Sequence, residues 1–129
     1  MLNQTEFKTV PGSTRKIILV DEKNSTAVSC KVANTGISAD ANGRKIAKAG
    51  TPLAGDLTAR GTAFTKATTT GGVSNAVGIL LHDVDVTDGT KNAQVVIFGT
   101  FDLNKFESDV AALIDSATKA ALKMIQFIK

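Results

Sequence analysis

The sequence predicts a mainly β fold with a small α component, that is, an α+β domain. Most of the chain consists of short apolar runs that alternate with polar residues and are separated by glycine-rich turns, as in an antiparallel β domain. An alanine-rich stretch near the C-terminus instead has helical spacing, and the last residues alternate again. With 129 residues, of which 43% are hydrophobic, the chain is long enough to form one domain with its own core.

Residues 1–32 are expected to form an N-terminal arm, either as a hairpin or as two extended segments. The first part is polar and is interrupted by Pro11-Gly12, and the runs Ile17–Val20 and Ala27–Val32 then flank the turn-forming sequence DEKNS. The run KIILV is too apolar to remain in water as an exposed edge. It therefore has to pair with its own domain, with a second copy of the chain or with another partner.

Residues 33–129 are expected to form the domain, with its β part at 33–103. Asn42-Gly43 predicts a two-residue hairpin turn between ISADA and RKIAKAG. Gly78 and Gly99 lie inside otherwise strong strands, which indicates a bulge or a close approach of backbones. The period of two places Val77, Ile79 and Leu81 on one face, and Val95, Ile97, Gly99, Phe101 and Leu103 on one face of the following strand.

Residues 104–123 predict helix, and residues 124–129 predict a closing strand. Because Asp115 with Ser116 can cap a second helix, the stretch forms either one helix or two short ones. MIQFIK alternates, as a strand does. The helical stripe, with steps of four and three, consists of Phe106, Val110, Leu113, Ala117, Ala120 and Met124.

The segment HDVDVTDG raises the question of a metal site, because it contains His82, Asp83, Asp85 and Asp88. A calcium loop that starts at Asp83 needs a bidentate Glu at its twelfth position, and this position is the neutral Gln94. Asp88-Gly89, in contrast, fits the chemistry of a turn between two strands. We therefore expect a turn, with no metal and no cofactor.

The sequence also predicts that the protein is not an enzyme. Cys30 is the only cysteine and His82 the only histidine, and neither lies in a nucleophile or metalloprotease motif. Cys30 lies in the alternating segment TAVSCKV, so a half-buried strand position is expected for it.

Charge and composition argue against nucleic-acid and membrane partners. The net charge is +3 with no block of like charge, and the chain has no Trp or Tyr on which bases could stack. No apolar run reaches the ~18 residues of a membrane span, and the N-terminus lacks the pattern of a signal peptide. We expect synthesis in the cytoplasm without export.

Three segments followed by a helix and a closing strand carry a resemblance to a known family. They are GTPLAGD (50–56), NAVGILLHDVDV (75–86) and VVIFGTF (95–101), and the closing strand contains IQFI. In this order they resemble the head decoration proteins of tailed phages, the lambda head decoration protein D family, over about 60% of the chain. The region before Gly50 is longer here, and the central turn is longer and more acidic. The matching residues are Thr51, Pro52, Leu53, Asp56, Ala76, Val77, Gly78, Ile79, Gly99, Thr100 and Phe101.

The resemblance implies a compact, β-clip-like domain that forms homotrimers. In this family the trimers bind the major capsid protein at three-fold and quasi-three-fold sites of the expanded head, on the outer surface of the virion, and stabilise it against the pressure of packaged DNA. The family's N-terminal arm is flexible in the free protein and becomes ordered as strands on the capsid, which is β-augmentation. For this chain, the expected capsid-binding residues are Phe7, Val10, Ile17, Ile18, Leu19 and Val20.

The alternative is a calcium- or carbohydrate-dependent adhesion module that uses the acidic turn at residues 83–88. The neutral Gln94 and the absence of Trp and Tyr argue against it. A small hydrolase that uses His82 with Cys30 or an aspartate is a third interpretation, and it lacks any nucleophile motif.

Overall fold

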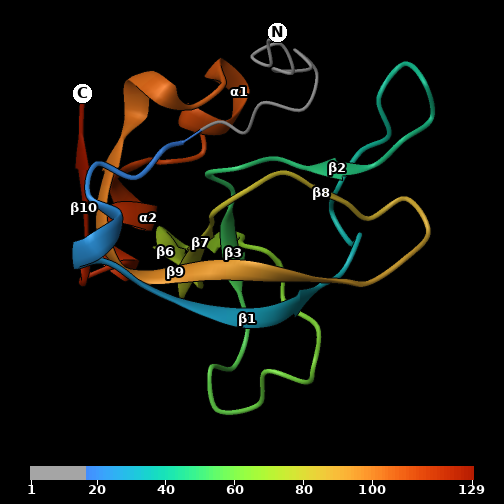
Figure 1. The fold of residues 1–129 in the computed structure, drawn as a ribbon, viewed down its shortest axis with the longest axis horizontal. Coiled ribbons are helices and arrows are strands. Elements are labelled where there is room, and N and C mark those ends of the chain that lie inside the picture. Colours follow the sequence, from blue (N-terminus) through green and yellow to red (C-terminus); the bar gives the residue numbers. More distant parts are fainter. Residues whose placement is uncertain (1–16) are drawn as a thin grey trace, which may run out of the picture.

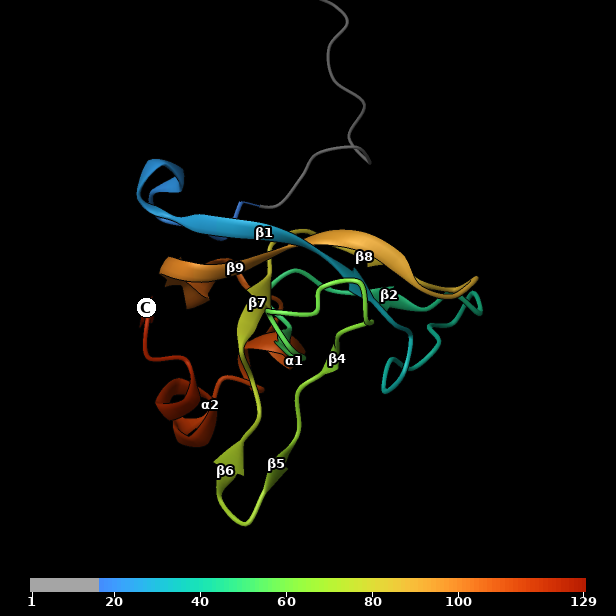
Figure 2. The same cartoon turned by 90° about the horizontal axis from the view of Figure 1, so that it is seen from below.

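The computed structural model describes residues 17–129 (Figures 1 and 2). It is 38% strand and 14% helix, so the expected mainly β class with a small α component is confirmed. The strands are β1 (Thr26–Val32), β2 (Ile46–Ala47), β3 (Pro52–Ala54), β4 (Thr65–Lys66), β5 (Thr69–Thr70), β6 (Val73–Ser74), β7 (Gly78–Leu80), β8 (Val84–Asp85), β9 (Lys91–Asp102) and β10 (Ile125–Ile128). The helices are the 3₁₀ turns η3 (Glu22–Asn24) and η4 (Leu103–Lys105) and the short α-helices α1 (Ser108–Ala111) and α2 (Ser116–Ala121).

The main sheet has the strand order β1-β9-β7-β3-β4, and its neighbours are antiparallel. β10 is added in parallel to the C-terminal half of β9. β2 pairs with β8, and β5 with β6, in two further small sheets. β9 is thus the central strand, and Figure 1 shows it running across the molecule beside β1.

The N-terminal part of the described chain belongs to this sheet. Leu19 forms an antiparallel bridge with Phe101, and β1 continues along the same edge of β9 after the η3 turn. Ile18 and Leu19 are buried in the same core cluster as Phe101. Residues 17–32 therefore share the sheet and the core of the rest of the described chain.

The faces of β9 differ from the expected alternation. Thr26 pairs with Phe98 and Ala27 with Val96, so Ile97 is an extra residue on β9, a β-bulge. Such a residue reverses the direction in which later side chains point. Val95 accordingly lies in one core cluster and Phe101 in the other, so the prediction that they share a face is wrong.

The core consists of two clusters, one beneath the C-terminal helices and one toward the β2–β8 pair. The first includes Ile79 and Val96, and the second includes Leu80 and Val95. Adjacent residues of β7 therefore point into different clusters, and both faces of the sheet are covered at its centre. This arrangement buries the strand GIL completely.

The predicted helix at 104–123 is interrupted. α1 ends at Ala111, and Asp115 has an extended backbone (φ −93°, ψ −176°) while its side chain accepts a hydrogen bond from the N–H of Thr118. Of the two forms left open by the sequence, the structure has two short helices, because Asp115 is an N-cap. The closing strand is confirmed as β10, at Ile125–Ile128.

The turn predicted at the acidic segment is present, whereas the turn at Asn42-Gly43 has three loop residues and not the expected two. The N–H of Asp40 donates to Arg44 O, and the N–H of Gly43 donates to Asp40 O. Asp40 Oδ1 accepts the backbone N–H groups of Asn42 and Arg44, and Gly43 has a positive φ of 77°. The arms beside this turn pair only through a single bridge, between Ala39 and Lys45. At the acidic turn, Gly89 N–H donates to Val86 O, and the chain then enters β9.

Candidate functional site

The run Ile17–Val20, expected to contact the capsid, lies against this chain's own β9. The N–H of Val20 donates to Thr100 O at 2.9 Å, and the N–H of Asp102 donates to Ile18 O at 3.1 Å. Ile18 and Leu19 are buried in a core cluster of this chain, so their side chains contact their own domain. Ile17 and Val20 are exposed. Phe7 and Val10 lie outside the described residues.

The residues of the family motifs are brought together in adjacent strands. Pro52 and Leu53 on β3 pair with Ile79 and Gly78 on β7, and Ile79 pairs in turn with Val96 on β9. Three segments that are far apart in sequence therefore form the centre of one sheet. Ala76 and Val77 precede β7, and Gly99, Thr100 and Phe101 lie near the end of β9.

Two further motif residues stabilise loops. The hydroxyl of Thr51, which is buried, donates to Lys48 O at 2.7 Å. Asp56 accepts hydrogen bonds from the N–H and hydroxyl of Thr58, and these bonds lower the pKa of its carboxyl. Both residues hold the conformation of a nearby loop.

Gly78 and Gly99 are sites of close approach, as their positions predicted. A Cβ on Gly78 would lie 2.5 Å from Val95 Cγ1 and 3.0 Å from Val96 O. Gly99 has a φ of 154°, and a Cβ there would lie 3.1 Å from Ser25 Cβ. The motif glycines are thus required by packing.

The acidic segment is a turn in which Asp83 and Asp85 accept hydrogen bonds from this chain. Asp83 Oδ1 accepts the N–H of Ala49 at 2.7 Å, which ties the segment to the loop before β3. Asp85 Oδ1 accepts the N–H and hydroxyl of Thr87, and these hydrogen bonds lower the pKa of the Asp85 carboxyl. Within residues 17–129, no group of three or more His, Cys, Asp or Glu side chains is arranged to hold a metal ion.

Cys30 lies on β1, as its alternating segment predicted, but it is buried and not half-buried. Burial raises the pKa of its thiol, and the nearby Arg60 guanidinium opposes this only in part. A thiol with a raised pKa is protonated near neutral pH and is a poor nucleophile. His82 lines a hollow of about 470 Å³ at some distance along the chain from Cys30, together with residues of β8 and of the start of β9.

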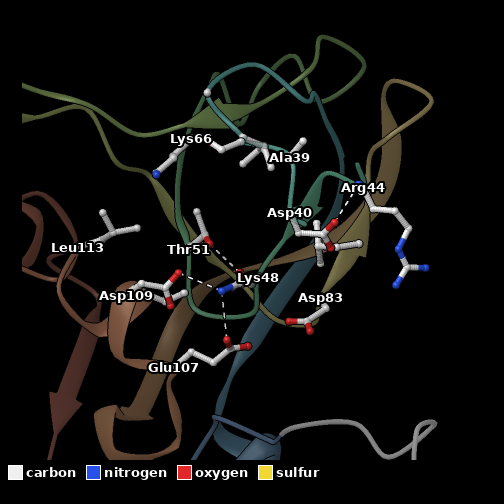
Figure 3. A pocket seen from close by; sticks show the side chains of 15 residues that line it. Ala39, Asp40, Arg44, Lys48, Thr51, Lys66, Asp83, Glu107, Asp109 and Leu113 are labelled. Carbon is white, nitrogen blue, oxygen red and sulfur yellow. Dashed lines mark hydrogen bonds and ion pairs between the residues drawn. The ribbon is translucent and has the colours of Figure 1, made fainter. Parts of the chain in front are cut away.

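A second hollow, of about 460 Å³, lies between the loop 36–40 and α1 (Figure 3). Lys48 Nζ lies 2.9 Å from Asp109 Oδ2 and 3.1 Å from Glu107 Oε1. The hydrogen bond with Asp109, followed by that with Glu107, raises the pKa of Lys48. A lysine held in its charged form is neither a nucleophile nor a base, so this group is an ion-pair link between the loop before β3 and the segment at α1. The charged residues that line this hollow are Asp40, Arg44, Lys48, Lys66, Asp83, Glu107 and Asp109.

Sequence reasoning missed this ion-pair group because Lys48 and Asp109 are 61 positions apart. No local spacing relates them. It also missed the surface at the C-terminal strand, where Phe98, Met124 and Ile128 are exposed. The sequence did contain an indication of that surface. Because MIQFIK alternates as a strand, some of its apolar side chains must point away from the core.

No protein-family model matches the chain, and a search of the curated proteins finds no significant match. In the described part of the chain, no helix has the length and apolar character that a bilayer crossing requires.

Proposed function

We propose that the protein is a structural decoration protein of a tailed-phage head, which binds as trimers to the major capsid protein at three-fold and quasi-three-fold sites of the expanded capsid. In this role it stabilises the head against the pressure of packaged DNA. It is made late, in the host cytoplasm, and resides on the outer surface of the virion. It acts through binding and carries out no chemical reaction.

The observation that carries the proposal is the order of three sequence segments, around Pro52, Ile79 and Phe101, followed by a helical stretch and a closing strand. The three segments lie in adjacent strands of one sheet. This arrangement supports the resemblance, because segments that pair with one another in the fold are expected to occur together in one sequence. Chance matches of a few residues would not be expected to pair with one another in the fold.

The kinds of surface present also support a binding role. Asp83 and Asp85 of the acidic turn accept hydrogen bonds from this chain's own backbone, the thiol of Cys30 is buried, and Lys48 is held by two acids. Among residues 17–129, exposed apolar side chains such as Val73, Phe98 and Met124 remain for contact with another molecule. Such features are typical of proteins that attach to a larger assembly.

The test is co-sedimentation with expanded capsids of the phage that encodes the chain, prepared without decoration protein. We expect saturable binding, with three copies for each three-fold or quasi-three-fold site and reinforcement by the many sites of the lattice. A protein of similar size and charge serves as the control for trapping. Absence of saturable binding, or a stable dimer both free and on the capsid, would contradict the proposal.

A further inference from the structure

The turn between Asp40 and Arg44 presents an asparagine followed by a glycine on the surface. Asn42 is the only asparagine of the sequence that precedes a glycine. Asn42 and Gly43 are both exposed, and a Cβ on Gly43 would have no heavy atom within 4 Å. Because glycine has no side chain that obstructs its own nitrogen, the backbone nitrogen of Gly43 can approach the side-chain amide of Asn42.

This turn is only weakly tied to the rest of the domain. Its two arms pair through a single bridge, between Ala39 and Lys45, and every residue from 38 to 44 is exposed. Segments with solvent-exposed backbone hydrogen bonds and few buried apolar contacts open locally at a low cost in free energy. The turn therefore opens more readily than the main sheet does.

Other asparagines of the described chain are held more firmly. Asn75 Oδ1 accepts the N–H of Thr68 at 2.8 Å, and Asn92 lies within β9. The side-chain amide of Asn24 donates to Asp21 Oδ2 at 2.6 Å. Within residues 17–129, an exposed asparagine, a following glycine and a weakly held turn occur together only at position 42.

These features allow the loss of the side-chain amide, a reaction that makes asparagine a labile residue. The backbone nitrogen of Gly43 attacks Cγ of Asn42, so that a nitrogen–carbon bond forms and the Cγ–Nδ2 bond breaks. The proton of the attacking nitrogen is transferred to the leaving group, which departs as ammonia and leaves a five-membered imide. Water then opens the ring on one side or the other. The product at position 42 is aspartate, or isoaspartate with an additional carbon in the main chain.

Asp40 opposes this reaction. The N–H of Gly43, whose nitrogen has to attack, donates to Asp40 O at 3.0 Å. Asp40 Oδ1 also accepts the backbone N–H groups of Asn42 and Arg44, each at 2.9 Å, and Figure 3 shows the bond with Arg44. The hydrogen bond from Arg44 is the main cause that lowers the pKa of the Asp40 carboxyl, so this acceptor stays ionised at neutral and alkaline pH. The nitrogen of Gly43 is thus directed toward Asp40 while the turn is closed.

We propose that Asn42 is a site of spontaneous deamidation, and that Asp40 limits the rate by holding the turn closed. The inference is independent of the proposed function. The reaction replaces a neutral amide by a carboxylate beside Asp40 and Arg44, which line the hollow of about 460 Å³. The isoaspartate product also lengthens the main chain inside the turn that the N–H groups of Gly43 and Arg44 close onto Asp40. The charge and shape of this surface therefore change as the protein ages.

The first test follows the intact, folded protein over time by peptide mapping with mass spectrometry, at neutral and at mildly alkaline pH. We expect aspartate and isoaspartate to form at position 42 faster at the higher pH, because the attacking nitrogen must lose its proton. In concentrated urea the conversion should be faster still, since the bonds to Asp40 are then broken. The inference is overturned if another described asparagine converts first, or if Asn42 converts in urea and stays intact in the folded protein. The asparagines to compare with it are Asn24, Asn34, Asn75, Asn92 and Asn104.

Variants at position 40 test the role of Asp40. Asp40→Ala removes the side-chain acceptor of two N–H groups and should speed the conversion of Asn42 by about 3-fold or more. Asp40→Asn keeps an acceptor oxygen and should stay within about 2-fold of the wild-type rate. Asp88→Ala, which removes the same charge from another exposed turn, is the control, and melting temperatures establish that all variants are folded. Equal rates for Asp40→Ala and Asp88→Ala would overturn the assignment of Asp40.

Discussion

Leu19 lies opposite Phe101 in an antiparallel bridge, and both side chains are buried in the same core cluster. The contact connects the start of the described chain to the end of its longest strand. It also decides between the partners that the apolar run KIILV could have had. For Ile18 and Leu19, the partner is their own domain.

Leu19→Ala should therefore destabilise the fold. Removing a buried leucine side chain costs about 2–5 kcal/mol, while Val20→Ala, at an exposed neighbour, should change stability by less than about 0.5 kcal/mol. Denaturant unfolding of both variants measures the difference. Equal stability, with loss of capsid binding in Leu19→Ala alone, would restore the run as a binding segment.

Gly78→Ala should also be destabilising, because the added methyl group would lie 2.5 Å from Val95 Cγ1 and 3.0 Å from a backbone oxygen. We expect a loss of about 1–3 kcal/mol from overpacking. Gly61→Ala is the matched control, since a Cβ there has no heavy atom within 4 Å. Its stability should be unchanged or slightly higher, because alanine restricts the unfolded chain. Similar effects at both positions would show that the close approach at β7 is not present.

The ion pair between Lys48 and Asp109 should produce a small, pH-dependent stabilisation. Lys48 lowers the pKa of the Asp109 carboxyl, so the contribution is present above the unfolded pKa of Asp109 and is lost as the pH falls through its lowered folded value. The raised pKa of Lys48 means that its contribution is complete below its unfolded pKa and is lost as the pH rises through the folded one.

Asp109→Asn measures this contribution. The side chain of Asp109 is 65% exposed, so solvent screening limits the expected loss at pH 7 to about 0.2–1 kcal/mol. The difference from the wild type should shrink below about pH 4, where the carboxylate becomes protonated. Asp88→Asn, in the exposed turn, is the control. A difference that stays constant down to pH 2 would argue against the ion pair.

Calcium and chelators should leave the melting temperature unchanged. Asp83 and Asp85 already accept hydrogen bonds from the backbone N–H groups of Ala49 and Thr87. Binding of calcium would have to displace them. A calcium-dependent rise of more than about 5 °C would support the adhesion-module alternative, since a ligand that binds the native state raises its stability by mass action.

Local chemistry explains what the sequence predicted correctly. The turn at Asn42-Gly43 needs a positive φ that glycine supplies, and the N-cap at Asp115 needs only a carboxylate close to the N–H of Thr118. The β10 strand and the burial of Cys30 follow from alternation over a few residues. Each of these features depends on residues near one another in the chain. At Asp115 the pattern allowed one helix or two short ones, and the structure has two.

Other features depend on contacts between distant segments, and only the tertiary structure decided them. The bulge at Ile97 arises where β1 meets β9, and it reverses the face of Phe101. The partner of Leu19 lies on β9, and the partner of Lys48 is 61 positions away. An apolar strand in the sequence indicates that the strand must be covered, and a charged residue indicates that it can form an ion pair. Neither pattern identifies the partner. The partner follows from which strand edges remain open once the rest of the sheet has formed.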